Sequence, residues 1–398
     1  KIDDSAFNSS SLEKITIPPN ITEIGVYSFS NCEKLKTISF HNDSKLIKIN
    51  SFAFFYSSIT EIVIPSSVLQ ICSRAFSSCI CLQKVEFQED SKLKIIENNA
   101  FASTKLEQII IPKHVTKICE ETFTCCEKLK TIDFPDDSEL KIIERNAFKD
   151  SSLERIKIPS SLEFLNDEWC KGTRNLNEII LMNNNQNFSY LNNSMIIGKS
   201  DSKSNHYDTI HFAVRNIKSV VIPSFIKRIA PDAFEECHEF KFIEFEKDSK
   251  LTCIDDYSFT CSSLSNICIP QSVKIIGCSA FYQCNKLKKV EFCHHSELSI
   301  IEKYAFSAVS INEIIIPPKV QIIYNGAFSN CTELKKVQFS PKSELSIIKS
   351  TAFITSNISS ISLPANLKYI GIQSFSYLSN LKIIEIEKLP KNSDNIPQ

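Results

Sequence analysis

Hydrophobic residues recur along the chain in short groups at two fixed intervals. Phenylalanine anchors lie alternately 22 and 25 residues apart, in two series. The series are Phe7, Phe29, Phe54, Phe76, Phe101, Phe123 and Phe148, and then Phe234, Phe259, Phe281, Phe306, Phe328, Phe353 and Phe375. Each interval also holds an apolar triplet spaced three and then two residues apart, such as Leu106, Ile109 and Ile111. Because alternate residues of a strand share a face, this pattern predicts one short strand per coil with its apolar side chains pointing inward.

Proline shows that two coils form a unit of 47 residues. It ends the strand of the shorter coil at Pro18, Pro65, Pro112 and Pro159, and again at Pro223, Pro270, Pro317 and Pro364. There the missing amide suits an exit from a sheet, whereas the longer coil ends its strand in a polar turn. Both lengths are typical of leucine-rich repeats, which have about 20 to 29 residues. About sixteen coils therefore predict a strand-rich α/β repeat solenoid, a horseshoe or arc with one parallel β-sheet and short helical turns.

The periodic pattern stops once, near the middle of the chain. The segment after Trp169 is rich in Asn and Ser, and its alternating apolar stretches predict a β-hairpin with Ser200 to His206 at its tip. We therefore expect one continuous solenoid with an N-terminal array (1–182), a hairpin-like insertion (183–216), a C-terminal array (217–389) and a tail (390–398). The insertion either bends or staples the array, or it forms a specific recognition element.

Composition and motifs narrow the function. The 398 residues are 42% hydrophobic and 23% charged with a formal net charge of -1, which is too balanced to favour nucleic acid. No apolar run reaches the length of about eighteen residues that a membrane span needs, so we expect no membrane insertion in this segment. The six glycines never form a phosphate-binding loop, and no set of catalytic side chains stands apart from the repeat. We therefore expect neither catalysis nor a cofactor.

Most cysteines follow the repeat. One recurs three residues after the anchor of every second coil, at Cys32, Cys79, Cys126, Cys237, Cys284 and Cys331. Positions two coils apart are separated by about 10 Å, too far for a disulfide, so we expect a column of buried thiols that pack like alanine. Irregular cysteines such as Cys81, Cys125, Cys253 and Cys261 could pair between adjacent coils. The cluster Cys293–His295 lacks a fourth ligand at a recognised spacing, so we expect a solvated turn and no metal site.

One side chain of each triplet points away from the core, between its second and third apolar residues. The partner-binding surface predicted from these positions consists of Val63, Glu86, Ile110, Asp133, Ile180, Val221, Glu244, Glu291 and Ile315. It carries an acidic row interleaved with apolar side chains, and lysines such as Lys36 and Lys130 form a basic row beside it. Exposed apolar groups rimmed by charges are typical of an interaction surface. The alternative is an ordinary solvated sheet whose β-branched residues serve strand propensity.

The segments SFSNCEKLKTISF, PSSVLQICSRAFSSC and PQSVKIIGCSAFYQC show the repeat motif clearly. They resemble the BspA-like leucine-rich repeats, the Treponema type, and the resemblance covers nearly the whole chain. NFSYLNNSMIIGKS is similar to the hairpin interruption of that family, and the abundance of Ile, Lys, Asn and Ser is most similar to its protozoan (parabasalid) branch. The chain departs from the family in having few glycines, with only Gly25, Gly277 and Gly371 at the usual site. That departure puts the geometry of the loops in question.

The resemblance implies a surface or secreted adhesin-like antigen. We therefore expect a non-catalytic protein that binds a host or cell-surface macromolecule through the exposed sheet face. The alternative is an intracellular structural or scaffold protein with a cytoplasmic or cytoskeletal partner, which the expected free thiols and the missing signal sequence favour.

Overall fold

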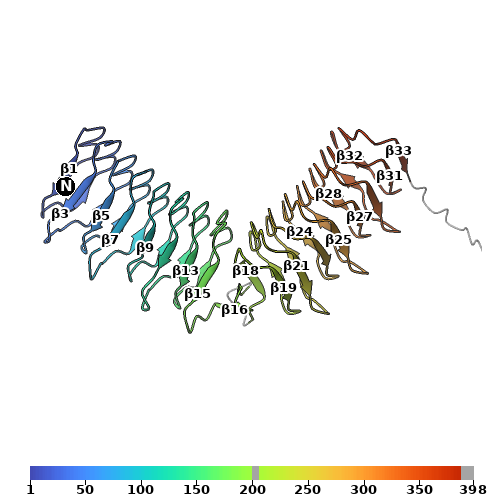
Figure 1. Ribbon diagram of the computed structural model, residues 1–398, viewed down its shortest axis with the longest axis horizontal. Coiled ribbons are helices and arrows are strands. Elements are labelled where there is room, and N and C mark those ends of the chain that lie inside the picture. Colours follow the sequence, from blue (N-terminus) through green and yellow to red (C-terminus); the bar gives the residue numbers. More distant parts are fainter. Residues whose placement is uncertain (200–205, 387–398) are drawn as a thin grey trace, which may run out of the picture. The chain divides into compact units, whose positions relative to one another are not determined.

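The computed structural model is a parallel β-solenoid of about sixteen turns, described for residues 1–199 and 206–386 (Figure 1). Its two compact units, residues 1–196 and 197–398, are treated separately below. The prediction of short helical turns was wrong, because no helix occurs within the described residues. Each coil returns instead through a two-residue strand and a series of turns. Those turns contain residues with positive φ, which do not occur in a right-handed helix.

Each coil contributes one front strand. In the first unit these are β1 (Lys14–Ile17), β3 (Thr37–Phe40), β5 (Glu61–Ile64), β7 (Lys84–Phe87), β9 (Gln108–Ile110), β11 (Thr131–Asp133), β13 (Arg155–Ile158) and β15 (Glu178–Leu181). In the second they are β19 (Ser219–Ile222), β21 (Phe242–Phe245), β23 (Asn266–Ile269), β25 (Lys289–Phe292), β27 (Glu313–Ile316), β29 (Lys336–Phe339), β31 (Ser360–Leu363) and β33 (Ile383–Ile386). The triplet residues point inward as predicted, and Ile62 and Ile64 are buried.

A second parallel sheet lies behind the front strands, where the sequence predicted only one sheet. It forms because the apolar group upstream of each anchor pairs with its equivalent in the next coil. Its strands in the first unit are β2 (Glu23–Ile24), β4 (Lys48–Ile49), β6 (Gln70–Ile71), β8 (Ile95–Ile96), β10 (Lys117–Ile118), β12 (Ile142–Ile143) and β14 (Phe164–Leu165). Those in the second are β20 (Arg228–Ile229), β22 (Cys253–Ile254), β24 (Ile275–Ile276), β26 (Ile300–Ile301), β28 (Ile322–Ile323), β30 (Ile347–Ile348) and β32 (Tyr369–Ile370).

The front strands pair over most of their length within a 47-residue, two-coil repeat, and over fewer residues between successive repeats. β5 pairs with β7 over all four residues, but β3 pairs with β5 only at Thr37 and Glu61. Among the described residues the front sheets end at β7 and restart at β9, and they end again at β25 and restart at β27. Within a two-coil repeat, the N–H of Gln88 donates to the carbonyl oxygen of Ile64 (3.1 Å). Between successive repeats, proline occupies the equivalent donor position at Pro65 and Pro112, so that hydrogen bond is missing.

Three strands occupy the interruption: β16 (Phe188–Leu191), β17 (Met195–Gly198) and β18 (Thr209–Ala213). β17 and β18 are neighbours in the back sheet of the second unit. The N–H of Leu181 donates to Tyr190 Oη (2.5 Å), which ties β16 to the end of β15. Of the predicted hairpin tip, residues 200–205 lie outside the described residues, and so does the predicted tail at 390–398.

The core is a stack of the anchor rings. From Phe7 to Phe148, each ring lies parallel to the next with centroids 5.0 to 5.7 Å apart. Trp169 ends the stack with an edge contact at 89° to Phe148. The cysteine column lies beside it, fully buried as predicted, and each thiol also donates a hydrogen bond that alanine could not make. The Sγ–H of Cys79, for example, donates to the carbonyl oxygen of Phe54 (2.9 Å).

The turns around each anchor replace glycine with other residues in the left-handed conformation. Two such residues flank the anchor in nearly every coil, as Phe52 and Tyr56 do around Phe54, both with φ of 58°. The three glycines at the usual site serve another purpose. A Cβ on Gly277 would lie 2.6 Å from the backbone of Asp255 in the previous coil, so this glycine permits close packing of the backbones.

Candidate binding surface

The front face consists of the outward side chains at the first and third positions of every front strand. In β7 these are Lys84 and Glu86, whereas Val85 between them is 5% exposed and faces the core. The residues predicted from the triplets are all third-position residues. The first-position column was missed, although residues i and i+2 of a strand necessarily share a face. It adds basic side chains to the surface, among them Lys84, Arg155 and Lys289.

Most of the predicted residues are solvent-exposed on this face. The apolar ones at Val63, Ile110, Val221 and Ile315 are 46, 66, 47 and 54% exposed. Glu86, Glu244 and Glu291 are also exposed, whereas Asp133 and Ile180 are half-buried. The lysines of the basic row are exposed beside the face.

Three carboxylates of the acidic row form ion pairs with basic residues of the first-position column. Lys84 Nζ lies 2.7 Å from Glu86 Oε1, and Lys289 Nζ lies 2.8 Å from Glu291 Oε1. Arg155 of β13 contacts Asp133 of the neighbouring strand β11 at 3.1 Å. The hydrogen bond from Lys84 to Glu86 raises the pKa of that lysine, which therefore stays charged at neutral pH. Surface pairs of this kind contribute little to stability, so their value here is a fixed pattern of donors and acceptors.

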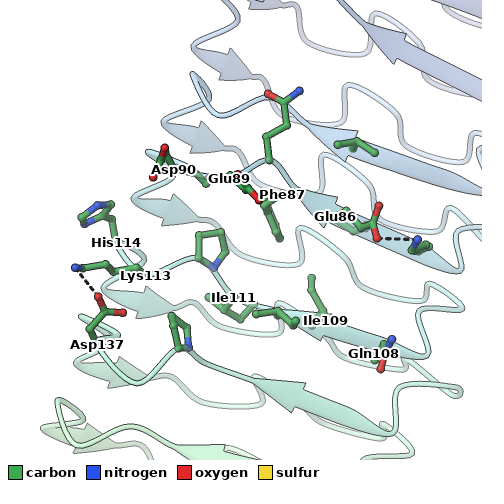
Figure 2. A pocket seen from close by; sticks show the side chains of 18 residues that line it. Glu86, Phe87, Glu89, Asp90, Gln108, Ile109, Ile111, Lys113, His114 and Asp137 are labelled. Atoms are coloured by element: carbon green, nitrogen blue, oxygen red, sulfur yellow. Dashed lines mark hydrogen bonds and ion pairs between the residues drawn. The ribbon is translucent and has the colours of Figure 1, made fainter. Parts of the chain in front are cut away.

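Groove 1, of about 850 Å³, lies between the C-terminal ends of β7 and β9 (Figure 2). The front sheet is interrupted here, and Pro112 has no backbone N–H to donate. The third-position residues Val63, Glu86 and Ile110 line it, together with the polar turn after Phe87. Figure 2 shows the ion pair of Lys113 with Asp137, 2.7 Å long, on its far rim.

Two further grooves occur in the second unit. Groove 3, of about 490 Å³, lies between β25 and β27, and its lining residues Lys289, Glu291 and Ile315 each lie 205 residues after Lys84, Glu86 and Ile110 of groove 1. Groove 2, of about 740 Å³, lies one 47-residue unit earlier and is lined by Glu244, Cys268 and Cys293. Among the predicted residues, Asp133, Ile180 and Val221 lie outside these three grooves. The grooves thus follow the two-coil unit and not the single coil.

A model of the BspA type leucine rich repeat region matches residues 1–107, 94–200, 207–317 and 299–397, with six copies. The chain belongs to this family. None of the curated proteins compared with the chain matches it. In this BspA-type protein, the short strands, the anchor stack and the interruption are therefore features of a repeat region that spans almost the whole sequence.

Solved structures of bacterial proteins share the BspA-type fold. A leucine rich cell surface protein from Faecalibacterium prausnitzii is 22% identical, with a TM-score of 0.60, over 97% of this chain and 83% of its own. The pneumococcal vaccine antigen PcpA is 20% identical, with a TM-score of 0.63, over 95% and 89%. A leucine-rich repeat protein from Eubacterium ventriosum is 19% identical, with a TM-score of 0.63, over 96% and 85%. These likenesses establish the fold and give the protozoan branch no support.

The turn after β25 holds the residues that the sequence singled out as candidate metal ligands in this BspA-type protein. Within residues 1–199 and 206–386, no three His, Cys, Asp or Glu side chains are grouped so that they could hold a metal ion. His294 and His295 are exposed in the turn after β25, as the sequence predicted. Cys268 Sγ and Cys293 Sγ, however, lie 3.4 Å apart, a pair that the sequence did not reveal. No helix in the described part of the chain is long and apolar enough to cross a membrane.

Proposed function

We propose that this chain is a non-catalytic protein-recognition module that binds its partner through the front face, at grooves 1 and 3. The observation that carries the proposal is the recurrence of one set of side chains in both units. A lysine, a glutamate and an isoleucine occupy equivalent places in each groove, and the lysine and glutamate form the same ion pair. Ile110 and Ile315 are more than half exposed, so packing does not account for them.

The chemistry of groove 1 indicates what the partner contributes. An apolar side chain resting on Ile110 and Val63 would bury surface that is otherwise hydrated, at roughly 25 cal/mol for each Å². Glu89 and Asp90 line the groove and form no ion pair within the described residues, so they favour a basic side chain next to that apolar anchor. The partner is thus a protein surface that presents an aliphatic or aromatic residue beside Lys or Arg.

A peptide selection tests this proposal and does not require the natural partner. A displayed random peptide library is selected on the folded protein, and the dissociation constant of the best binder is measured by fluorescence anisotropy. We expect the double variant Val63→Glu with Ile110→Glu to bind at least tenfold more weakly, equivalent to about 1.4 kcal/mol. The selected peptides should be enriched in an apolar residue next to Lys or Arg.

The matched control is Ile80→Glu, since Ile80 is 55% exposed but does not line groove 1. Its affinity should stay within twofold of the parent. Equal binding by the double variant and the parent contradicts the proposal, and so does an equal loss in the control. Circular dichroism verifies the fold, and the milder Ile110→Ser replaces the double variant if that one unfolds.

We further propose that the module acts at the cell surface as an adhesin-like antigen. Supporting this location, two proteins with the same fold are described as a cell surface protein and a vaccine antigen. The sixteen free cysteines favour the alternative, a cytoplasmic scaffold in a reducing compartment. Antibody labelling of intact, non-permeabilised cells decides between them: staining supports the surface, and staining only after permeabilisation supports the scaffold.

A further inference from the structure

Two thiols from adjacent coils meet on the front face of the second unit. Cys268 is the third residue of β23 and pairs in register with Glu291 of β25, and Cys293 directly follows that strand. Their sulfur atoms are 3.4 Å apart, and Cys268 is exposed whereas Cys293 is half-buried. Both line groove 2, so a small molecule in solvent can reach them.

We propose that Cys268 and Cys293 form a modification site, at which a small-molecule disulfide is reduced and an intrachain disulfide forms across the front face. The buried cysteine column offers no comparable site, because its thiols are 0% exposed and donate to backbone carbonyl oxygens. The inference stands on the contact between the two sulfurs and does not depend on the proposed protein-binding function.

The reaction proceeds by two thiol–disulfide exchanges. The Cys293 thiolate attacks one sulfur of the small disulfide RSSR, forming a mixed disulfide and releasing one thiolate RS⁻. The Cys268 thiolate then attacks the sulfur of Cys293 and expels the second RS⁻. Two protein thiols are oxidised, one RSSR is reduced to two RSH, and the two thiol protons pass through solvent to the released thiolates.

The order of these steps follows from the surroundings of the two sulfurs. Partial burial and then the hydrogen bond with Cys293 raise the pKa of Cys268 to about 11, so Cys268 is a poor first nucleophile. Once Cys293 carries the mixed disulfide, Cys268 is the neighbouring thiol that can resolve it. The second step therefore becomes faster as pH rises, because the Cys268 thiolate is the attacking species.

The backbone holds the pair together and still leaves room for the bond. The N–H of Cys293 donates to the carbonyl oxygen of Ile269 (3.1 Å), which keeps the two coils in register. A disulfide needs the sulfurs to approach from 3.4 Å to about 2.05 Å. Side-chain rotation and a small shift of the turn after β25 supply this approach, since the front sheet ends at that strand.

Oxidised glutathione is the probe. The folded, fully reduced protein is incubated with it at pH 8, alkylated and digested without reduction, and the peptides are identified by mass spectrometry. We expect a peptide pair joined through Cys268 and Cys293 as the main intrachain product, two hydrogens lighter than its reduced form. In Cys268→Ser, Cys293 should instead accumulate as a stable glutathione adduct.

Cys278 in the same protein is the internal control, because its Sγ faces Ser279 Oγ at 3.8 Å. It is half-exposed and should gain glutathione without forming an intrachain link. The proposal is overturned if other cysteines supply the main disulfide, if Cys293 retains glutathione equally in the parent and in Cys268→Ser, or if neither thiol reacts. If the serine variant does not fold, the parent alone still decides the first and the third of these outcomes.

Discussion

The ring of Phe281 lies parallel to that of Phe306 one coil later, with 5.0 Å between ring centroids and 2° between the ring planes. On its other side Phe259 makes an almost identical contact at 5.0 Å and 3°. Each interior anchor of a unit is thus enclosed by two others, and its packing depends on both neighbouring coils. Such stacking adds about 0.5–1.5 kcal/mol per pair to the free energy gained from burial.

Replacing an interior anchor should therefore cost more than replacing a terminal one. Phe281→Ala leaves a cavity between two rings and should lower the free energy of unfolding by about 3–5 kcal/mol. Phe375→Ala is the matched control, because Phe375 is half-buried and, among the described residues, stacks only on Phe353. Urea unfolding followed by circular dichroism measures both variants. Equal losses would show that the stack does not act as an array of paired contacts.

Sequence reasoning reached the parts of the fold that one coil determines by itself. The triplet spacing located the front strands because residues i and i+2 of a strand share a face, and the anchors marked the core. The two-residue back strands escaped detection, since two residues show no periodicity. The non-glycine residues with left-handed backbone, such as Tyr56, also gave no signal, because side chains of almost any kind fill those positions.

The candidate site was predictable only in part for the same reason. Third-position residues such as Ile110 could be assigned to the face from the triplets. The ion pair of Lys84 with Glu86 could be predicted only by assigning every residue of the strand to a face. The groove could be predicted only by comparing which coils end their strand in proline. The contact between Cys268 and Cys293 depends on the register of two coils and a turn, which the chain sets only once it is folded.

Replacing the glycine four residues before an anchor should destabilise the fold where the backbones of two coils touch. In Gly277→Ala, the new Cβ would lie 2.6 Å from both the carbonyl carbon of Asp255 and the nitrogen of Asp256. We expect this substitution to lower the free energy of unfolding by about 1–3 kcal/mol, because the backbone must move. Cys119→Ala, at the same repeat position, adds no atom and should cost less. Equal midpoints for Gly277→Ala and the parent in urea would contradict the close approach.

The buried thiols should make the protein less stable in alkaline solution. Burial raises the pKa of Cys79 to about 12 and that of Cys126 to about 11. An unfolded cysteine has a pKa of about 8.5, so the unfolded chain loses its thiol protons first as pH rises. The stabilising contribution is therefore fully present below about pH 8.5 and is lost progressively as pH rises toward 11–12. At pH 10 the loss is roughly 2 kcal/mol for each thiol.

A double variant isolates this effect from the titration of lysine and tyrosine. Cys79→Ala with Cys126→Ala lacks these two thiols and keeps every other titrating group. Urea unfolding of parent and variant is compared at pH 8 and pH 10, under reducing conditions. The parent should lose about 4 kcal/mol more than the variant between these pH values, whatever their difference at pH 8. If parent and variant lose the same free energy of unfolding between pH 8 and pH 10, the prediction is contradicted. Burial would then not raise the pKa of these two thiols.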